Sequence, residues 1–268
     1  MLVALRLGLQ SATMTELIRA DLLLAQRGLA SSRTAAQALI EAGRVTLHEA
    51  GAALVLRKPS HKLPPDADLA VAADPADRFV SRGGLKLAGA LAHTGLAVDG
   101  LHCLDVGIST GGFSDCLLQA GAAVVVGVDV GHGQLHPRLA AEPRLTLFEG
   151  VNARALDAAT ILAANAGQPF DLAVADVSFI SLTLVLPAMV PLLRPGGRLL
   201  CLVKPQFEVG REGLGKGGIV RDAARYQVVR NKIETTVVEL GLQLQDWFDS
   251  PIAGGDGNRE FFVFAIRP

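Results

Sequence analysis

One stretch of the chain, residues 101–134, constrains its fold more than any other. A short apolar run ends at Asp105, a glycine-rich turn begins at Gly107, and residues 113–120 have a helical pattern. A second apolar run ends in another acid, Asp129. This order predicts a strand, a turn, a helix and a second strand, which together form a ligand-binding unit of an α/β fold.

The turn between the two strands favours S-adenosylmethionine as the ligand. Its sequence is DVGISTGG, and Ser109 stands where the dinucleotide fingerprint G-x-G-x-x-G needs its second glycine. No G-x-x-x-x-G-K-[ST] loop occurs in the sequence. The carboxylate of Asp105 would repel a phosphate but suits an ammonium group, and Asp129 is placed to accept hydrogen bonds from ribose hydroxyls. A turn that only packs the helix onto the strand is the alternative.

The composition is typical of a soluble α/β protein. Half of the residues are apolar and only 4% are aromatic, as expected for buried strands rich in valine. The three cysteines form no C-x-x-C motif, which fits a reducing cytosol. The N-terminus lacks a signal-peptide cleavage pattern, and the longest uncharged stretch, residues 177–193, contains two prolines and is shorter than a membrane span. We therefore expect a cytoplasmic protein that does not enter a membrane.

Charge is distributed unevenly along the chain, although the net charge is only −1. Residues 1–62 contain eight Lys or Arg residues against four Asp or Glu residues, whereas the remainder contains seventeen against twenty-two. This asymmetry predicts a basic binding module attached to an acidic catalytic domain. We expect a disordered extension over residues 1–13, the module over 14–73, a linker over 74–80 and the catalytic domain over 81–268.

The N-terminal module has the pattern of two helices followed by short strands. The expected elements are a helix from Thr13 or Thr15 to about Gln26, a helix over 33–41, and strands over 45–47 and 53–56. The segment RADLLLAQRGLASSRTAAQALIEAGRVTL resembles the S4 domain, a small α+β RNA-binding fold. The resemblance covers most of residues 16–72 and implies that this module binds RNA.

Four arginines of the module are candidates for RNA contact: Arg19, Arg27, Arg33 and Arg44. Any one of them could instead be a solvated charge on a helix surface. Because all four lie within residues 1–62, where positive charge is in excess, contact with a phosphate backbone is the preferred interpretation.

The remainder of the chain continues the alternation of strands and helices. The expected elements are a helix around Lys86, strands over 145–148, 171–176 and 198–203, helices over 184–193 and 223–239, and strands over 243–249 and 260–266. The last two strands are expected to form an antiparallel hairpin that closes a mostly parallel sheet. The glycine-rich segment over residues 206–222 is expected to form a loop over the site.

Four polar residues at the ends of these elements can converge: Lys86, Asp176, Lys204 and Glu260. Asp176 and Lys204 follow successive strands, at the sheet edge where open α/β sheets bind ligands. The set resembles the Lys-Asp-Lys-Glu tetrad of FtsJ-like ribose 2′-O-methyltransferases. The motifs SRGGLKL, LDVGISTGGF, VDVGHGQL, ADVSFIS, VKPQFE and GKGGIVRD resemble the TlyA family in particular, in which an S4 domain precedes such a methyltransferase domain.

This resemblance implies a Rossmann-like methyltransferase with a mostly parallel seven-stranded sheet. It also implies methyl transfer from S-adenosylmethionine to a ribose 2′-hydroxyl of cytidine in 16S or 23S ribosomal RNA, free or in assembled subunits. A ribose hydroxyl needs a base near neutral pH, and we assign that role to Lys204. Lys86 and Asp176 would orient the base and the hydroxyl, and Glu260 would hold the lysines. No metal is required, and the histidines are not in ligand spacing.

The same resemblance assigns residues to the cofactor. The loop residues are Asp105, Gly107, Ser109, Thr110, Gly111, Gly112 and Phe113, with Asp129 on the ribose and Asn152 beside the adenine. A turn-forming role for Asn152 is an equal alternative. Ile108 stands where a smaller residue is expected and His132 where an aromatic residue is common, so Ile108 could narrow the pocket.

Three other functions compete with this interpretation. Members of the family have been labelled haemolysins, so a membrane-active protein is the main rival, although neither a signal peptide nor a spanning helix is expected. A ribosome-assembly factor would bind RNA without catalysis, which leaves the tetrad without a role. A small-molecule methyltransferase would leave the basic module unexplained.

Overall fold

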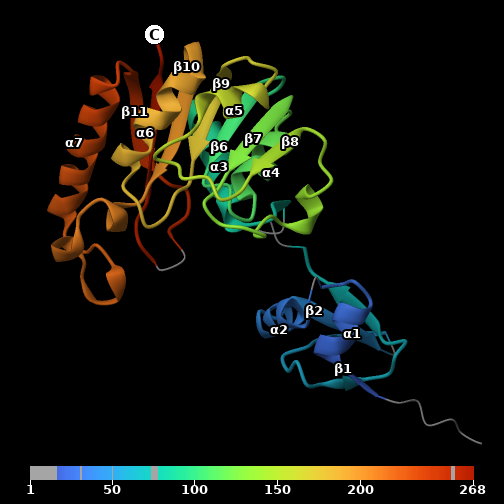
Figure 1. Ribbon diagram of the computed structural model, residues 1–268. Helices are drawn as coiled ribbons and strands as arrows, with labels where there is room; N and C mark the ends of the chain where they lie inside the picture. The colour runs from blue at the N-terminus through green and yellow to red at the C-terminus, as the bar shows by residue number, and fades with distance from the viewer. Residues whose placement is uncertain (1–16, 31, 50, 74–77, 255–256) are drawn as a thin grey trace, which may run out of the picture. The chain divides into compact units, whose positions relative to one another are not determined.

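The computed structural model describes residues 17–30, 32–49, 51–73, 78–254 and 257–268. The chain divides into two compact units, Met1–Pro75 and Ala76–Pro268 (Figure 1). The expected extension over residues 1–13, the caps Thr13 and Thr15 and the first part of the expected linker lie outside the described residues.

The first unit packs two helices against small antiparallel sheets. Its elements are β1 (Ile18–Arg19), α1 (Ala20–Gln26), α2 (Arg33–Glu41), β2 (Val45–Glu49), β3 (Ala52–Val55), β4 (Lys62–Leu63) and β5 (Asp68–Val71). Strand β2 pairs with β3 and with β5, and β1 pairs with β4. Leu24, Ile40 and Val45 are fully buried in one core. The unit is therefore an α+β fold, as the S4 resemblance implied.

The first helix begins later than the sequence pattern predicted. Arg19 is extended and pairs with β4, and the helix begins at Ala20. The backbone N–H groups of Ala20 and Asp21 donate to the carbonyls of His61 and Pro59 at 2.7 and 3.1 Å. Backbone carbonyls of a distant segment thus accept hydrogen bonds from N–H groups of the first turn, for which the sequence pattern predicted a capping side chain. Strands β1, β4 and β5 were not predicted, because strands of two to four residues show little periodicity.

The second unit is built on a seven-stranded sheet. Its strands are β6 (His102–Val106), β7 (Val124–Val128), β8 (Leu145–Phe148), β9 (Phe170–Ala175), β10 (Leu193–Val203), β11 (Gln243–Asp249) and β12 (Phe261–Ile266). They lie in the order β11-β12-β10-β9-β6-β7-β8. Strand β12 is antiparallel to β10 and β11, and the remaining pairs are parallel. The prediction of a mostly parallel sheet closed by an antiparallel hairpin is confirmed.

Helices cover both faces of this sheet (Figure 1). The helices are α3 (Arg82–Thr94) and α4 (Gly112–Gln119) on one face, and α5 (Ala158–Ala163), α6 (Leu186–Met189) and α7 (Ala223–Glu239) on the other. Side chains alternate along each strand, so that Leu172 and Val174 of β9 pack toward α3 and α4 while Ala173 and Ala175 join the opposite core. Burial of both faces explains why the strands are almost continuously apolar.

The prediction of one helix over residues 184–193 is wrong. Only α6 is α-helical there, and 3₁₀ turns flank it at Leu182–Leu184 and Val190–Leu192. Pro187 and Pro191 have no N–H to donate, and each begins a separate turn. Helix α5 was not predicted, because its six residues give less than two turns of periodicity. Further 3₁₀ turns lie at Pro137–Leu139, Pro205–Phe207, Arg211–Gly213 and Lys216–Gly218.

The strand order places a binding edge at the carboxyl ends of β6 and β9. From β6 the chain continues to β7 and β8 on one side, and later to β9 and β10 on the other. Ligands of open α/β sheets bind at such a reversal of strand order. Gly107 follows β6 with a φ of +84°, and a Cβ at this position would lie 2.8 Å from the carbonyl oxygen of Asp176. Only glycine allows the two loops to approach this closely.

Candidate active site

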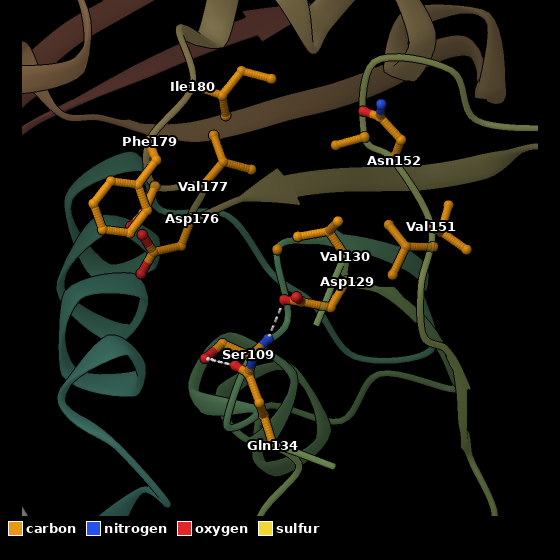
Figure 2. A pocket seen from close by; sticks show the side chains of 14 residues that line it. Ser109, Asp129, Val130, Gln134, Val151, Asn152, Asp176, Val177, Phe179 and Ile180 are labelled. Atoms are coloured by element: carbon orange, nitrogen blue, oxygen red, sulfur yellow. Dashed lines mark hydrogen bonds between the residues drawn. The ribbon is translucent and has the colours of Figure 1, made fainter. Parts of the chain in front are cut away.

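A cavity of about 560 Å³ opens at this sheet edge (Figure 2). The loops after β6, β7, β8 and β9 line it with Gly107, Ser109, Val128, Asp129, Val130, Gln134, Val151, Asn152, Ala153, Asp176, Val177, Ser178, Phe179 and Ile180. Four residues that the sequence assigned to the cofactor, Gly107, Ser109, Asp129 and Asn152, are among them. The volume is in the range of small-molecule sites.

Asp129 joins the loop after β6 to the loop after β7. Its Oδ2 accepts a hydrogen bond from the Ser109 backbone N–H at 2.8 Å, and its Oδ1 accepts one from the Gly131 N–H at 2.7 Å. The Ser109 hydroxyl donates to Gln134 Oε1 at 2.9 Å (Figure 2). Each Asp129 oxygen accepts one of these hydrogen bonds, and a carboxylate oxygen can accept a second one from a ligand.

A smaller hollow of about 150 Å³ adjoins the first. It shares Gly107, Ser109, Asp176 and Ser178 with the larger cavity, and its other lining residues are Ser81, Gly83, Ile108, Thr110, Gly112, Phe113 and Lys204. The sequence-assigned residues Thr110, Gly112 and Phe113 therefore lie at this second hollow. Because Lys204 lies there too, the catalytic candidates and the cofactor candidates share one edge.

Asp105 lines neither hollow and is completely buried. Its Oδ2 accepts a hydrogen bond from the Ser114 hydroxyl at 2.7 Å, whereas its Oδ1 has no partner. Burial raises the pKa of this carboxyl to about 7; the Ser114 hydrogen bond opposes the shift, and the carboxylates of Asp176 and Asp129 add to it. In the part of the chain that the structure describes, no cation forms an ion pair with Asp105. The site therefore contains a buried acid that lacks a positive partner.

Gly111 and Asn152 have structural roles in the loops that form the site. Gly111 is the N-cap of α4 with a φ of +93°, and a Cβ there would collide with Leu139 rather than enter a cavity. Asn152 Oδ1 accepts the Arg154 N–H at 3.0 Å, so this residue forms a turn and also lines the large cavity. Both roles considered for Asn152 are compatible.

The four tetrad residues form two ion pairs. Lys204 Nζ lies 2.5 Å from Asp176 Oδ1 and donates to the Ser178 hydroxyl at 2.9 Å. Lys86 Nζ lies 2.5 Å from Glu260 Oε2. The side chains of Lys86 and Glu260 are 9% and 2% exposed, and those of Lys204 and Asp176 are 12% and 21% exposed. The first pair is thus more open to a substrate and the second more deeply buried.

The two pairs influence each other electrostatically. Burial raises the pKa of Glu260, and the ammonium groups of Lys86 and Lys204 oppose that shift, while the Asp176 carboxylate adds to it. Charges of both signs from both pairs therefore act on one carboxyl. Elements that are far apart in the sequence, α3 and the strands β9, β10 and β12, bring the four side chains to one place.

Comparison with known proteins finds two families that match this chain. Residues 79–267 match the FtsJ-like methyltransferase family, and residues 18–47 match the S4 domain. The first match covers most of the second unit. The chain belongs to the FtsJ-like methyltransferase family.

Individual relatives narrow the family further. The 16S/23S rRNA (cytidine-2'-O)-methyltransferase TlyA of Mycobacterium tuberculosis is 42% identical over 92% of this chain and 88% of that protein. Hemolysin A of Brachyspira hyodysenteriae is 34% identical over 93% of this chain and 100% of that protein. A solved structure from Streptococcus thermophilus that bears a hemolysin name has 38% identity and a TM-score of 0.71, covering 94% of this chain and 89% of that one. The chain is a member of the TlyA family, and the resemblance seen in its motifs is confirmed.

The arginines predicted to contact RNA interact within the first unit of this methyltransferase. Arg19 and Arg33 both donate to the buried carboxylate of Asp21, at 2.9 and 3.0 Å. Arg27 donates to the carbonyls of Ala67 and Pro65, and Arg44 donates to that of Ala72 at 2.7 Å. These contacts fix the guanidinium groups at the surface of the S4 domain, and contact with RNA stays a prediction.

Sequence reasoning missed two residues of the loop after β9. Ser178 accepts the Lys204 hydrogen bond. Phe179 is 91% exposed, has a φ of +64° and lies with its ring centroid 5.1 Å from that of Phe207. A positive φ is uncommon for a bulky residue and marks a position worth a functional explanation. The motif ADVSFIS contains both residues, but an aromatic residue after a strand is more often part of the core.

The two departures from the family pattern lie at the edges of the site. Ile108 is 4% exposed and packs over Gly127 of β7, where any Cβ would collide with it. Its side chain also contributes to the wall of the small hollow. His132 lies beside Gly150, where a Cβ would be 2.9 Å from its Nε2. Gly127 therefore provides much of the room that the larger Ile108 side chain requires.

Proposed function

We propose that the protein transfers a methyl group from S-adenosylmethionine to the 2′-hydroxyl of a cytidine in 16S or 23S ribosomal RNA. The Lys204–Asp176 ion pair, at the junction of the two hollows, is the observation that carries this proposal. The named activity of the Mycobacterium tuberculosis relative supports ribosomal cytidine as the target. This substrate would place the protein in the cytoplasm.

The residues of the larger cavity fit S-adenosylmethionine. Asp129 offers carboxylate lone pairs to ribose hydroxyls, and Asn152 lies on the same wall for an adenine. Asp105 lines neither hollow, so its charge would favour a bound ammonium group through the electrostatic field and not by direct contact. When bound, S-adenosylmethionine would supply an electrophilic methyl group on a sulfonium centre.

Lys204 is the residue best placed to take the proton of a ribose hydroxyl. Such a hydroxyl is a poor nucleophile until its proton is removed. Asp176 and Ser178 fix the amine at the hollow, and the side chain keeps 12% exposure through which a hydroxyl could reach it. Much of the rate enhancement would come from holding the reacting groups in line.

The first unit and the exposed Phe179 ring support an RNA substrate. The S4 match covers two helices within residues 1–62, which hold eight basic residues against four acidic ones. Phe179 presents a flat apolar face beside Asp176, and bases of single-stranded nucleic acid stack on such faces.

Relatives with hemolysin names favour one second candidate, a membrane-active protein. Among the described residues, no helix is long and apolar enough to cross a bilayer. Dye release from liposomes of bacterial lipid by the purified protein would support this candidate, whereas intact vesicles together with RNA methylation would reject it.

The decisive experiment measures transfer of radiolabelled methyl groups to separated ribosomal subunits from a strain that lacks the methylation. The wild type is expected to label RNA, and Lys204→Ala to lose at least about 100-fold in rate because the proton acceptor is gone. Arg230→Ala removes an exposed cation from α7 and serves as the matched control. Label on neither subunit, with cofactor binding established, would contradict the ribosomal assignment.

A further inference from the structure

Glu208 is a buried acid that the proposed reaction has not used. Its side chain is only 1% exposed, yet three donors bind its carboxylate. Oε1 accepts the Leu182 backbone N–H at 2.6 Å, and Oε2 accepts the Ser181 hydroxyl at 2.6 Å and Lys232 Nζ at 2.8 Å. Charge-assisted hydrogen bonds of this length are among the strongest that side chains form.

Two of the three partners of Glu208, Ser181 and Leu182, belong to a segment that carries the site. Ser181 and Leu182 end the loop that begins at Asp176 and contains Ser178. Glu208 itself ends the turn that begins at Lys204, since the N–H of Phe207 donates to the Lys204 carbonyl at 2.9 Å. One carboxylate therefore joins the loop of Asp176 to the turn of Lys204.

The sheet does not fix these two segments to each other. The parallel ladder between β9 and β10 ends at the pair Ala175–Cys201. Asp176 lies one residue beyond that pair and Lys204 three residues beyond it, so neither is held by backbone pairing of the two strands. Outside the ladder, the described contacts between the two segments include those of Lys204, the Phe179–Phe207 ring contact and the hydrogen bonds of Glu208. Lys232 also bridges them, since its Nζ donates to the Ser181 hydroxyl at 3.1 Å and to Glu208.

We infer that Glu208 is a positioning residue that holds the Lys204 turn against the Asp176 loop. The inference rests on the proposed function for its effect on rate. Glu208 does not touch either catalytic candidate in the described contacts, and it acts through the backbone on both sides of the Lys204–Asp176 pair. Lys232 lies on α7 and its side chain is 41% exposed. Its ammonium group neutralises the buried Glu208 carboxylate and thereby connects Glu208 to α7.

Three variants test this role. Glu208→Ala removes the acceptor of the Leu182 N–H and the Ser181 hydroxyl. The double variant Glu208→Gln with Lys232→Met keeps an oxygen for Leu182 and an N–H for Ser181, and removes the ammonium group that would face an amide. Glu234→Ala is the matched control, because it deletes an acid from the exposed i,i+4 pair with Arg230 on α7.

Three readouts separate positioning from general damage. The single-turnover rate of methyl transfer reports the Lys204–Asp176 geometry, and calorimetric binding of S-adenosylmethionine reports the cofactor pocket. Hydrogen exchange of residues 176–184 and 204–210 reports the junction without requiring any activity.

Glu208→Ala is expected to lower the rate about 100-fold, as small misplacements of catalytic groups do, with faster exchange in both segments. Its affinity for S-adenosylmethionine should stay within about 3-fold of wild type. A general loss of structure would instead lower both the rate and the affinity. The double variant should recover most of the rate, and Glu234→Ala should match wild type.

A normal rate in Glu208→Ala, or equal losses of rate and cofactor affinity, would overturn the inference. So would a double variant that stays as slow as Glu208→Ala. If the wild type transfers no methyl group, the proposed function fails by itself. The exchange rates then decide the inference alone: unchanged exchange in Glu208→Ala would overturn it, and faster exchange in both segments would support it.

Discussion

At the residue scale, Asp105 is a buried acid whose charge would respond to a bound cation. It is fully buried, its Oδ1 has no partner, and its pKa is raised to about 7 chiefly by burial. The titratable groups that act on it are Asp176 and Asp129, which favour its neutral form. A cation delivered by a ligand would favour its charged form.

Binding of S-adenosylmethionine should therefore depend on pH through Asp105. Above about pH 7 the acid is charged and binding is tightest; below it, a proton competes with the ligand ammonium, and affinity should fall by up to about tenfold per pH unit. Calorimetric titration between pH 5.5 and 8.5, a range of about 1.5 units on each side of that pKa, measures this slope. Asp105→Asn keeps the Ser114 hydrogen bond and should bind weakly with a flat profile. A flat profile in the wild type would contradict the role of Asp105.

The Lys86–Glu260 pair should show a large difference between single and double replacement. Lys86→Met leaves a carboxyl that is 2% exposed without its cation, which should cost about 3 kcal/mol of unfolding free energy. Adding Glu260→Gln removes the unpaired acid and should restore most of that loss, while methyl transfer stays abolished in both variants. Urea unfolding with parallel activity assays measures the two effects. Stability that falls further in the double variant would show that Glu260 stabilises the fold even without Lys86, and would contradict this expectation.

At the element scale, two adjacent glycines at the start of α3 should respond differently to alanine. A Cβ at Gly84 would collide with the buried Phe79 ring, whereas one at Gly83 would make ordinary contacts at 3.4 Å with Ser81 Oγ and 3.5 Å with Phe113. Overpacking should cost Gly84→Ala about 1–3 kcal/mol. Gly83→Ala should be neutral or stabilising by up to about 1 kcal/mol, because alanine favours a helix. Equal unfolding free energies for the two variants would refute this difference.

The sequence predicted those elements whose pattern is long or locally capped. Strand β11 and helix α7 have the expected bounds, because seven and seventeen residues are long enough to show an alternating pattern and several helical turns. Strand β1 and the broken helix around α6 differ from expectation. Long-range backbone bonds to His61 and Pro59 determine the first, and two prolines determine the second.

The sequence indicated which residues would meet at the candidate site, but not which of them would form ion pairs with each other. The ends of strands and the motif contexts indicated Lys86, Asp176, Lys204 and Glu260, since strand ends meet at one edge. Which lysine pairs with which acid depends on how side chains from distant segments meet in space. Lys86 and Glu260, for example, are 174 residues apart in the sequence. The same holds for the arginines. Arg19 and Arg33 both form ion pairs with Asp21, and the spacing of these residues in the sequence did not predict those pairs.

At the scale of the whole molecule, each unit has a separate core and a buried acid with an opposite response to pH. The Arg19 guanidinium, with help from Gln37 and Arg33, holds the pKa of Asp21 well below its usual range. That contribution to stability is present above the unfolded pKa and is lost as the pH falls. Burial instead raises the pKa of Asp105 to about 7, so its favourable neutral form stabilises the second unit at low pH, and this contribution is lost as the pH rises toward 7.

Calorimetric unfolding should therefore show two transitions that move in opposite directions with pH. Between pH 8 and 5, the range that spans the Asp105 pKa of about 7, the transition of the second unit should rise by several degrees, and Asp105→Asn should remove that rise. Below about pH 4, the usual range of an aspartate, the transition of the first unit should fall. Asp21→Asn should lower that transition at neutral pH and flatten its acid dependence, because the charge that binds two arginines is already gone. The two variants also assign the transitions, since each should shift only one of them. One transition that both variants shift equally would mean that the two cores unfold as a single cooperative unit.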